Sequence, residues 1–489
     1  MQRTPIIFAI ATICLAASCR PVGPNYHRPD APTATAWKTE APWREAAPGD
    51  QVSKGEWWTA FGDSQLDALE KQALDANQTL KGAMARLEQA RAQARISISA
   101  LFPQASVGPS IQRQREPGNR PFLTTPGAGS ITSNIFTIPF SVTWEPDFFG
   151  RIRRNIESSQ ASYQAAGADL ANLRLSVTAE LAGDYFNARQ LDTQIGVLNR
   201  TVESFEKGLQ LVQSRERGGV ASGLDVAQEQ ALLDTTRTQA ILLKQQRAQF
   251  EDAIATLTGQ PAPNFKLAVE EIATKAPAVP LGVPSDLLER RPDIAEAERQ
   301  MASANAQIGV AQAAYYPSFP LTLSGGLESV SVSTLASSSS TFWAAGVSAI
   351  EDIFTGGARR AQVQFNEAGY QNTVANYRQT VLTAMQEVED ALAGLAVIDE
   401  AVKTQAAAVT DSRKALDIAT NRYTGGLVSY LDVVSAQQTL LSNEDLAAQL
   451  DGQRLVTSVL LIKALGGGWD AQSIAALKVK VSNKQALSP

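Results

Sequence analysis

Few residues in this chain carry the groups that catalysis or metal binding depends on. The sequence holds one histidine, His27, and two cysteines, Cys14 and Cys19. His27 lies in a proline-rich stretch near the N-terminus. Acid-base catalysis by histidine, His/Cys metal sites and disulfide frameworks all require more partners than these. The sequence therefore predicts a protein that is not an enzyme and holds no metal and no catalytic cofactor.

Cys19 is the one residue that we expect to be chemically modified. Residues 1–18 read as a signal peptide, since an apolar run of about 14 residues follows Arg3 and is too short to span a bilayer. The small residues Ala16, Ala17 and Ser18 stand directly before Cys19 and resemble a bacterial lipobox. This predicts a covalent lipid on Cys19, with N-palmitoyl and S-diacylglycerol groups. The alternative is an ordinary signal peptide followed by a free cysteine. Arg20, where an aspartate would favour retention at the inner membrane, favours sorting to the outer membrane.

The charge pattern argues against nucleic acid as a partner. The formal net charge is −6, from 43 Lys+Arg and 49 Asp+Glu, and neither sign forms a block. Nucleic-acid binding is associated with a basic patch or stripe, which this chain lacks.

The chain is an internal duplication. Residues 218–226 match residues 425–433, which lie 207 positions later, and both segments carry a Gly-Gly pair followed by Ser-x-x-Asp. Phe102-Pro103 likewise matches Tyr316-Pro317. We therefore expect repeat 1 at 64–262 and repeat 2 at 285–469. An N-terminal segment at 19–63, a linker at 263–284 and a tail at 470–489 would flank them.

Each repeat is predicted to read helix, strand, loop, strand, long helix, turn, helix. In repeat 1 a helix over 65–100 precedes the strands, because its composition and spacing are helical and Pro103 ends it. Period-two alternation of apolar and polar residues then marks strands. The expected elements are strands 104–115 and 134–145 around loop 116–133, strands 319–330 and 340–350 around loop 331–339, and helices 151–215, 222–258, 357–420 and 429–465.

Four strands of this kind cannot close a barrel, and an open sheet edge is not viable in lipid. If the strands span a membrane, the chain must oligomerise, and three chains would supply twelve strands, an even number in the observed range. Trp144 and Trp343 are candidates for an aromatic girdle at the membrane border. The alternative for both is ordinary packing against the helices.

The helices are unusually long and carry coiled-coil spacing. At about 1.5 Å per residue the helix 151–215 would approach 100 Å. Its second half places apolar residues from Leu191 to Val212 at alternating steps of four and three, which is a heptad pattern. A helical hairpin inside a soluble bundle is the alternative, although soluble bundles seldom need such length or strands inserted between the helices.

The turn of each repeat is where function is expected. The pairs Gly218-Gly219 and Gly425-Gly426 would end the long helices in a left-handed conformation. Asp225 and Asp432 would then lie in the first turn of the following helices, as part of Ser-x-x-Asp capping boxes. Capping alone is the plainer reading for both aspartates; a gating or cation-binding role is the alternative.

Together these residues resemble the TolC-type outer-membrane factors, in the OprM-like or NodT-like lipoprotein branch. No single motif is specific, but their order within a duplicated chain is. The resemblance rests on Val22-Gly23-Pro24, Trp57-Trp58, Leu101-Phe102-Pro103, Phe149-Gly150-Arg151, Arg290-Arg291-Pro292-Asp293, Leu431-Asp432-Val433 and Gly466-Gly467-Gly468-Trp469.

The resemblance implies an α+β membrane protein that works as a homotrimer. Its twelve-stranded β-barrel would lie in the outer membrane, continuous with a periplasmic α-helical barrel and an equatorial α/β belt. It would act as the exit duct of a tripartite efflux pump, fed by a periplasmic adaptor and an inner-membrane transporter of the resistance-nodulation-division type. Implied aperture residues are Asp432, Asp225, Tyr423 and Arg422, and the turn glycines Gly218, Gly219, Gly425 and Gly426 would contact the adaptor.

Two other functions fit parts of the pattern. A duct for type I protein secretion is the alternative within transport, although the lipobox and the Cys-Val-Gly-Pro-like start favour small-molecule efflux. A coiled-coil envelope lipoprotein is the alternative of another class, but such a spacer would not need four alternating strands.

Overall fold

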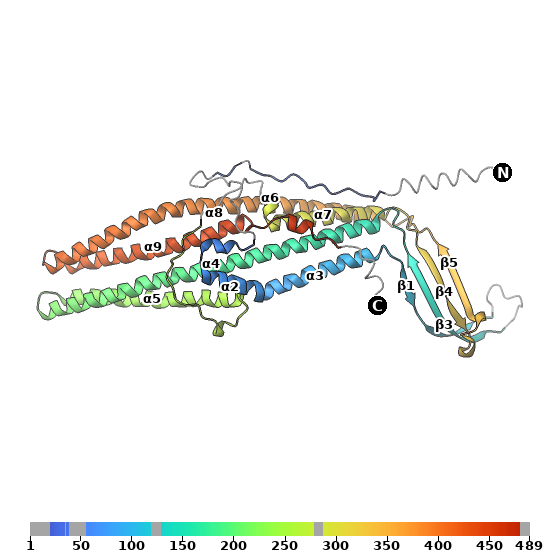
Figure 1. Ribbon diagram of the computed structural model, residues 1–489, viewed down its shortest axis with the longest axis horizontal. Coiled ribbons are helices and arrows are strands. Elements are labelled where there is room, and N and C mark those ends of the chain that lie inside the picture. The colour runs from blue at the N-terminus through green and yellow to red at the C-terminus, as the bar shows by residue number, and fades with distance from the viewer. Residues whose placement is uncertain (1–19, 35, 39–54, 119–128, 278–286, 480–489) are drawn as a thin grey trace.

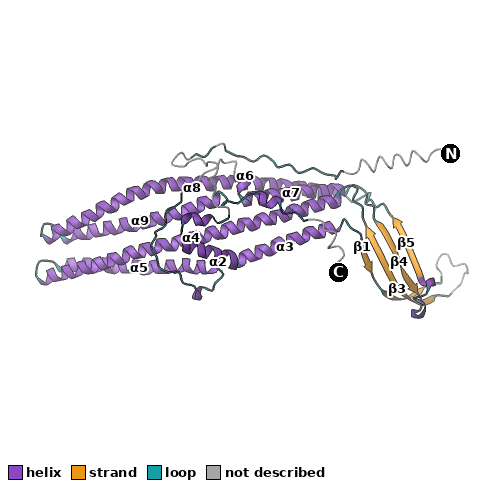
Figure 2. Cartoon of the chain, viewed as in Figure 1, coloured by secondary structure: helices purple, strands orange, loops and turns teal. Residues whose placement is uncertain are grey.

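The protein is a long molecule with a helical bundle at one end and a β-sheet at the other (Figure 1). The structure is a computed structural model that describes residues 20–34, 36–38, 55–118, 129–277 and 287–479. Cys14, Cys19 and the predicted signal peptide lie outside the described residues. Helices account for most of the length, and the strands form one separate block (Figure 2).

The duplication is visible as pairs of helices of equal length. Helices α3 (Gln78–Ser99) and α7 (Pro292–Ala313) have 22 residues each. Helices α4 (Arg151–Arg217) and α8 (Ala358–Thr424) have 67 each, and α5 (Gly223–Leu257) and α9 (Tyr430–Ala464) have 35 each. The long helices run two and four residues past the ends expected at 215 and 420, because their C-terminal turns continue up to the glycines. Each long helix and its shorter successor form one hairpin, and the two hairpins lie side by side (Figure 1).

One expected helix is broken. The sequence predicted a single helix over 65–100, but the structure has α2 (Ser64–Ala76) and α3 with Asn77 between them. Asn77 has an extended ψ of 124°, and its side-chain oxygen accepts a hydrogen bond from Leu80 N at 3.0 Å. Asparagine favours such caps because its side chain replaces a missing backbone partner.

The sheet contains β1 (Gln104–Val107), β2 (Ser110–Glu116), β3 (Ile131–Trp144), β4 (Leu321–Ser329) and β5 (Thr341–Val347). All pairs are antiparallel, with β1 and β2 end to end on one side of β3 and β4 and β5 on the other. The single strand expected at 104–115 is therefore two strands. Pro109 lies between them and Pro139 lies opposite Gly108, and neither proline has an N–H for the ladder.

The other strand boundaries differ by a few residues. β3 begins at Ile131 instead of 134, because the polar residues Thr132 and Asn134 still pair with β2. β4 and β5 are shorter than the expected 319–330 and 340–350, and only a bridge between Ser318 and Ile350 extends them. The loop between them holds two short 3-10 turns, Val332–Thr334 and Ser338–Ser340.

The two faces of the sheet differ sharply in polarity. Opposite residues share a face, so the register places Phe136, Ile138, Phe140, Val142 and Trp144 of β3 on one side, with apolar partners such as Ile111, Val107, Leu323 and Leu321. The other side carries serine, threonine and glutamine, with Ser106 and Ser141 in hydrogen-bond contact at 2.8 Å. We call these the apolar face and the polar face.

The main hydrophobic core lies midway along the helices. Trp57, Trp58 and Phe61 of a 3-10 turn (Trp57–Phe61) pack with Tyr185 and Phe186 of α4. The ring centroids of Phe61 and Phe186 are 4.9 Å apart. This cluster packs α2 and the segment after α5, which includes Phe265 and Leu267, against the long helices. We call α2 and this segment the belt.

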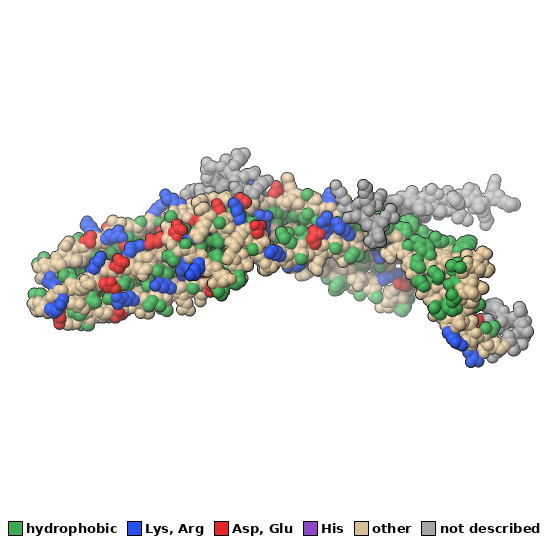
Figure 3. All heavy atoms as spheres, turned by 60° about the horizontal axis from the view of Figure 1, so that its bottom comes forward, with side chains coloured by type: hydrophobic (Ala, Val, Ile, Leu, Met, Phe, Trp, Pro, Cys, Tyr) green, Lys and Arg blue, Asp and Glu red, His purple; other side chains and the backbone are tan. Residues whose placement is uncertain are grey.

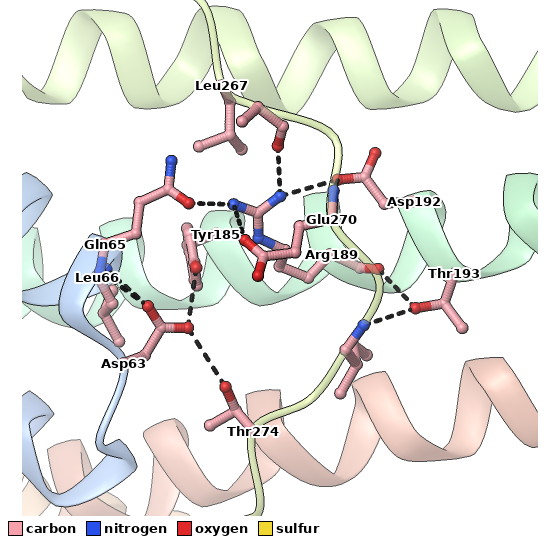
Figure 4. Close-up of polar contacts among 12 residues, drawn as sticks. Asp63, Gln65, Leu66, Tyr185, Arg189, Asp192, Thr193, Leu267, Glu270 and Thr274 are labelled. Carbon is pink, nitrogen blue, oxygen red and sulfur yellow. Dashed lines mark hydrogen bonds and ion pairs between the residues drawn. The ribbon is translucent and has the colours of Figure 1, made fainter.

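A buried charge network fastens the segment after α5 to this belt. Arg189 of α4 contacts Gln65, the Ala268 carbonyl at 2.6 Å and Asp192 at 3.0 Å, and Arg247 of α5 contacts the other oxygen of Asp192 at 2.7 Å. The side chain of Asp192 is fully buried. Nearby, Asp63 caps α2 and accepts hydrogen bonds from Tyr185 and Thr274 (Figure 4).

The described N-terminal segment is held at the junction between sheet and helices. Val22 N donates to the Phe149 carbonyl at 2.9 Å, just after β3 ends. Arg154 is 3% exposed and donates to the carbonyls of Val22 and Gly23 at 3.1 and 3.0 Å. Two further arginines that follow the strands are ion-paired, Arg153 with Asp147 and Arg359 with Asp352.

Within the described residues no helix is both long and apolar enough to span a membrane.

Candidate functional site at the hairpin ends

The two hairpins end side by side at the pole of the molecule that is farthest from the sheet (Figure 1). Both turns have the same backbone geometry. Gly219 and Gly426 take left-handed φ angles of +76° and +73°. Val220 N bonds the Arg215 carbonyl and Leu427 N bonds the Arg422 carbonyl, both at 2.9 Å. These bonds define a Schellman turn, which satisfies the last carbonyls of each long helix.

The two following helices start differently. Ser222 Oγ accepts from Asp225 N at 3.3 Å and the Asp225 carboxylate accepts from Ser222 N at 2.9 Å, which completes the predicted capping box. The box expected at Ser429 and Asp432 is not formed, because the Ser429 hydroxyl donates to the Asp432 carboxylate at 2.8 Å instead.

An arginine of one hairpin lies on a tyrosine of the other. The guanidinium carbon of Arg215, in the last turn of α4, is 4.8 Å from the ring centroid of Tyr423 in α8. Arg215 Nη1 also donates to the Thr424 carbonyl at 3.3 Å. Tyr423 is 6% exposed, and burial raises the pKa of its phenol. Cation–π contacts of this kind contribute about 0.5–2 kcal/mol.

Tyr423 is part of a small hydrophobic core between the two hairpins. Its ring centroid is 4.9 Å from that of Tyr430, and both rings pack with Phe205 and Val212 of α4 and Leu233 of α5. We call this group the tip core. It is separate from the main core, so the contact between the hairpin ends depends on it.

One buried carboxyl group lies inside the tip core. Glu229 of α5 is fully buried, and neither of its carboxylate oxygens forms a well-aligned hydrogen bond with the described residues. The Tyr430 hydroxyl and the Gln437 amide of α9 face it, and Gly208 of α4 leaves the space that it occupies. Burial is the main reason that the pKa of Glu229 lies above its usual range.

The structure separates the aperture candidates into two sets. Asp432 and Arg422 are exposed and Asp225 is half-buried, whereas Tyr423 is buried between the hairpins. Gly218, Gly219, Gly425 and Gly426 form the two turns. The apolar side chains Val220, Leu224, Leu427 and Leu431 flank these turns and are 55–72% exposed.

The girdle candidates lie at different heights of the sheet. Trp144 ends β3 beside the helices and donates its indole N–H to the Leu101 carbonyl at 3.0 Å. Trp343 lies opposite Gly325, four residues along β5 from the level of Trp144, and is 81% exposed. The two tryptophans therefore lie at different positions along the strands, and a girdle role for either stays a prediction.

Sequence reasoning missed Arg215, Glu229 and Tyr430. Glu229 carried a usable signal, because Val226, Glu229, Leu233 and Thr236 follow the three-four spacing of a buried stripe. A charged residue at such a position points to a buried polar contact. Arg215 and Tyr430 offered no comparable signal.

Comparisons with known proteins agree with this architecture. The sequence profile of the outer membrane efflux protein family matches residues 69–260 and 283–467, once in each half of the chain. The chain is 33% identical to the pyoverdine export outer membrane protein OpmQ of Pseudomonas aeruginosa, with 96% of this chain and 99% of OpmQ aligned. It is 32% identical to the toluene efflux pump outer membrane protein TtgF of Pseudomonas putida, over 91% of this chain and 94% of TtgF.

Among solved structures, the outer-membrane channel OprN superposes with a TM-score of 0.84 at 31% identity, covering 92% of this chain and 99% of OprN. The resemblance to TolC-type outer-membrane factors is thus confirmed over most of the chain. The chain therefore belongs to the outer membrane efflux protein family, as an outer-membrane exit duct of an efflux pump.

Proposed function

We propose that three copies of this chain form one duct, with the sheet as a third of a twelve-stranded barrel and the hairpins as a third of a periplasmic helical tube. Each chain supplies four barrel strands, because β1 and β2 lie end to end and count as one. The observation that carries this proposal is the pair of open edges on the sheet. Within the described chain β5 pairs only with β4, and β1 and β2 pair only with β3. An open edge in lipid leaves backbone groups without partners, so neighbouring copies must supply them.

The polarity of the sheet supports the same arrangement. In a transmembrane barrel the apolar face meets lipid and the polar face lines the lumen. The serine, threonine and glutamine side chains of the polar face would then pass hydrated solutes. Chemical energy would come from elsewhere in the pump, and this component would act as a passive conduit.

The surface of the hairpin ends indicates which proteins the duct binds. We propose that the exposed apolar side chains around the two glycine turns meet a periplasmic adaptor, which links the duct to an inner-membrane transporter of the resistance-nodulation-division type. Four exposed apolar residues around two solvent-facing turns support a protein contact at this pole. Small molecules are the proposed cargo, since the relatives named above are an export component for pyoverdine and an efflux component for toluene.

Cys19 is proposed to carry the lipid anchor. The described chain begins at Arg20, and Val22 is bonded to Phe149 at the level where the apolar face of the sheet starts. An acylated Cys19 would therefore lie next to the membrane border, where its chains could enter the same leaflet. The proposed location is the outer membrane, with the helices in the periplasm.

Two measurements test the duct. Native mass spectrometry of the protein in mild detergent should give a mass of three chains. The same preparation in a planar bilayer should give discrete conductance steps. In cells that lack their own outer-membrane component, expression with a matching pump should lower drug accumulation. A stable monomer with full channel activity would overturn the trimer, and passage of an unfolded protein substrate but not of small molecules would favour type I secretion.

A further inference from the structure

A pair of basic residues interrupts the apolar face of the sheet at its far end. On β2 the residues of this face are Ile111, Arg113 and Arg115. Both arginines are exposed, and they are the only basic residues in the five strands. In Figure 3 apolar atoms cover the sheet next to the helices, and basic atoms gather at its far end.

The change from apolar to polar occurs at one level on adjacent strands. Ile111 lies opposite Phe136, and both are apolar. At the next outward position Arg113 lies opposite Asn134, and at the one after it Arg115 lies opposite Thr132. β2 and β3 therefore leave the apolar band together, as two strands crossing one membrane border would.

The height of the band fits a bilayer. Phe136 to Trp144 covers nine residues of β3, which are separated by eight residue steps. At about 3.3 Å per residue this is about 26 Å along the strand, or about 20 Å across a membrane at the usual barrel tilt. Outer-membrane barrels have an apolar band about 25 Å tall. Arg113 and Arg115 would thus lie at the level of the outer-leaflet headgroups.

The local charges leave this corner of the apolar face positive. The strands contain two acids, Glu116 and Glu328, and the register puts both on the polar face. Arg115 donates to Ser130 Oγ at 3.0 and 2.8 Å, which holds its guanidinium at the end of the strand. In the described sheet no carboxylate shares the apolar face with the arginines.

We propose that Arg113 and Arg115 bind the phosphate monoester groups of a phosphorylated glycolipid in the outer leaflet. A guanidinium matches phosphate oxygens with two parallel hydrogen bonds and is weakly hydrated, so it suits a membrane border. The adjoining Ile111 and Phe136 would pack against the acyl chains of the same lipid. This inference rests on the proposed trimer, in which the apolar face meets lipid.

The test uses neighbouring glutamines as a matched control. In the first variant Arg113→Gln and Arg115→Gln remove the pair. In the second, Arg113→Gln and Arg115→Gln are combined with Gln112→Arg and Gln114→Arg, which moves the same charges to the polar face without changing composition. Trimers in detergent are titrated with diphosphorylated lipid A, dephosphorylated lipid A or phosphatidylglycerol, and bound lipid is counted by native mass spectrometry.

Wild type should retain diphosphorylated lipid A, and each arginine removed should weaken that binding about fivefold. The variant with moved charges should bind as weakly as the variant without them. Equal retention by wild type and both variants, or equal binding of dephosphorylated lipid A, would overturn the proposal. Equal binding of phosphatidylglycerol would show a general anion site and would equally overturn it.

Failure of the duct itself is distinguishable in the same experiment. The trimer peak reports assembly, and the efflux assay reports transport, so both are read independently of bound lipid. If the double variant fails to assemble, the single variants Arg113→Gln and Arg115→Gln carry the test, because each changes one exposed side chain. Retained transport with lost lipid binding is the expected result.

Discussion

At the scale of single residues, the hairpin ends contain side chains with two different tasks. Tyr423 and Glu229 are buried between the hairpins, so they affect how the ends hold together. Asp432 is exposed beside its turn, and its carboxylate accepts a hydrogen bond from the Ser429 hydroxyl. Substitutions at these positions should therefore separate effects on assembly from effects on the pore.

Asp432→Asn tests whether this acid acts on the pore. Three exposed carboxylates near one axis would repel each other and attract cations. Asparagine still accepts a hydrogen bond at a helix start, so the fold is preserved. We expect an intact trimer with a thermal midpoint close to that of wild type, and a higher conductance or a weaker cation preference in a planar bilayer. Asp225→Asn tests the second aperture candidate, in the other hairpin, by the same two measurements. Lost stability with unchanged conductance would leave Asp432 as a helix-start residue only.

Glu229→Gln tests the buried carboxyl of the tip core. Below about pH 4.3 the group is protonated in both the folded and unfolded chain and has no effect on stability. At higher pH the unfolded chain loses this proton while the folded chain keeps it, because the folded pKa is raised. Stability therefore falls as pH rises through this window. Gln cannot ionise, so the variant should lose this part of the pH dependence and gain stability at pH 8.

Hydrogen exchange of α5 and α9 near the hairpin ends, at pH 5 and pH 8, measures this effect locally. After correction for the base-catalysed rise of the intrinsic exchange rate with pH, wild type should be less protected at pH 8 than at pH 5, whereas Glu229→Gln should be equally protected at both. Glu216→Gln, which changes an exposed acid close to the same turn, is the control and should behave as wild type. The same pH response in wild type and Glu229→Gln would contradict the assignment.

At the scale of elements, turns and clamps hold the helices in register. The glycine turns end α4 and α8 with identical geometry, although 207 positions separate them. The belt network joins α2, α4, α5 and the segment after α5. The turn and the belt network each predict that a particular substitution lowers the stability of the fold.

Gly426→Ala should destabilise the second hairpin turn. Nothing lies within 4 Å of an added Cβ, so steric contact is not the reason. The φ of +73° costs an L-residue about 1–2 kcal/mol. Gly223→Ala is the control, since its site is equally open and has no left-handed φ, and it should be neutral or slightly stabilising. Thermal unfolding and protease cleavage at the turns measure the difference; equal stability of both variants would contradict the turn argument.

Arg189→Met should loosen the belt. It removes a buried partner of Asp192, and breaking a buried pair costs about 3–5 kcal/mol, near the low end here because Arg247 remains. Arg200→Met is the control on the same helix. Arg200 pairs with Glu271 at 2.6 Å, but both side chains are about half exposed, so its loss should cost less than about 1 kcal/mol. Limited proteolysis of residues 265–277 reads out the difference, and equal cleavage of both variants would refute the clamp.

At the scale of the whole molecule, anchoring and length set where the two poles lie. The sheet and the hairpin ends are at opposite poles, and the described N-terminus is bound where sheet and helices meet (Figure 1). A lipid at this junction would fix the height of the duct in the membrane. The sheet would insert independently of the lipid.

Cys19→Ala should abolish acylation and leave the trimer in place. Metabolic labelling with palmitate should mark wild type and not the variant, while membrane fractionation should find both in the outer membrane. Ser18→Thr, which keeps the cysteine, is a control for processing. Equal labelling of Cys19→Ala and wild type would remove Cys19 as the lipid site. Efflux is expected to persist in part, because the barrel strands insert without the anchor.

The sequence alone determined the features that depend on local periodicity. Heptad spacing, Gly-Gly pairs and period-two alternation place the long helices, the turns and the strands near their observed bounds, because each signal is contained in a few neighbouring residues. The duplication followed from matching segments. Boundaries that depend on one hydrogen bond, such as Asn77 or the Pro109 gap, differed from expectation.

Only the tertiary structure decided which side chains meet between the repeats. Arg215 reaches Thr424 across 209 positions, and Glu229 faces Tyr430 and Gln437 from another hairpin. These contacts depend on the orientation of one coiled-coil hairpin relative to the other. The helical spacing within either hairpin does not determine that orientation. The register that puts Arg113 beyond Ile111 and Phe136 on one face is likewise fixed by strand pairing, since a shift by one residue would move every side chain to the other face.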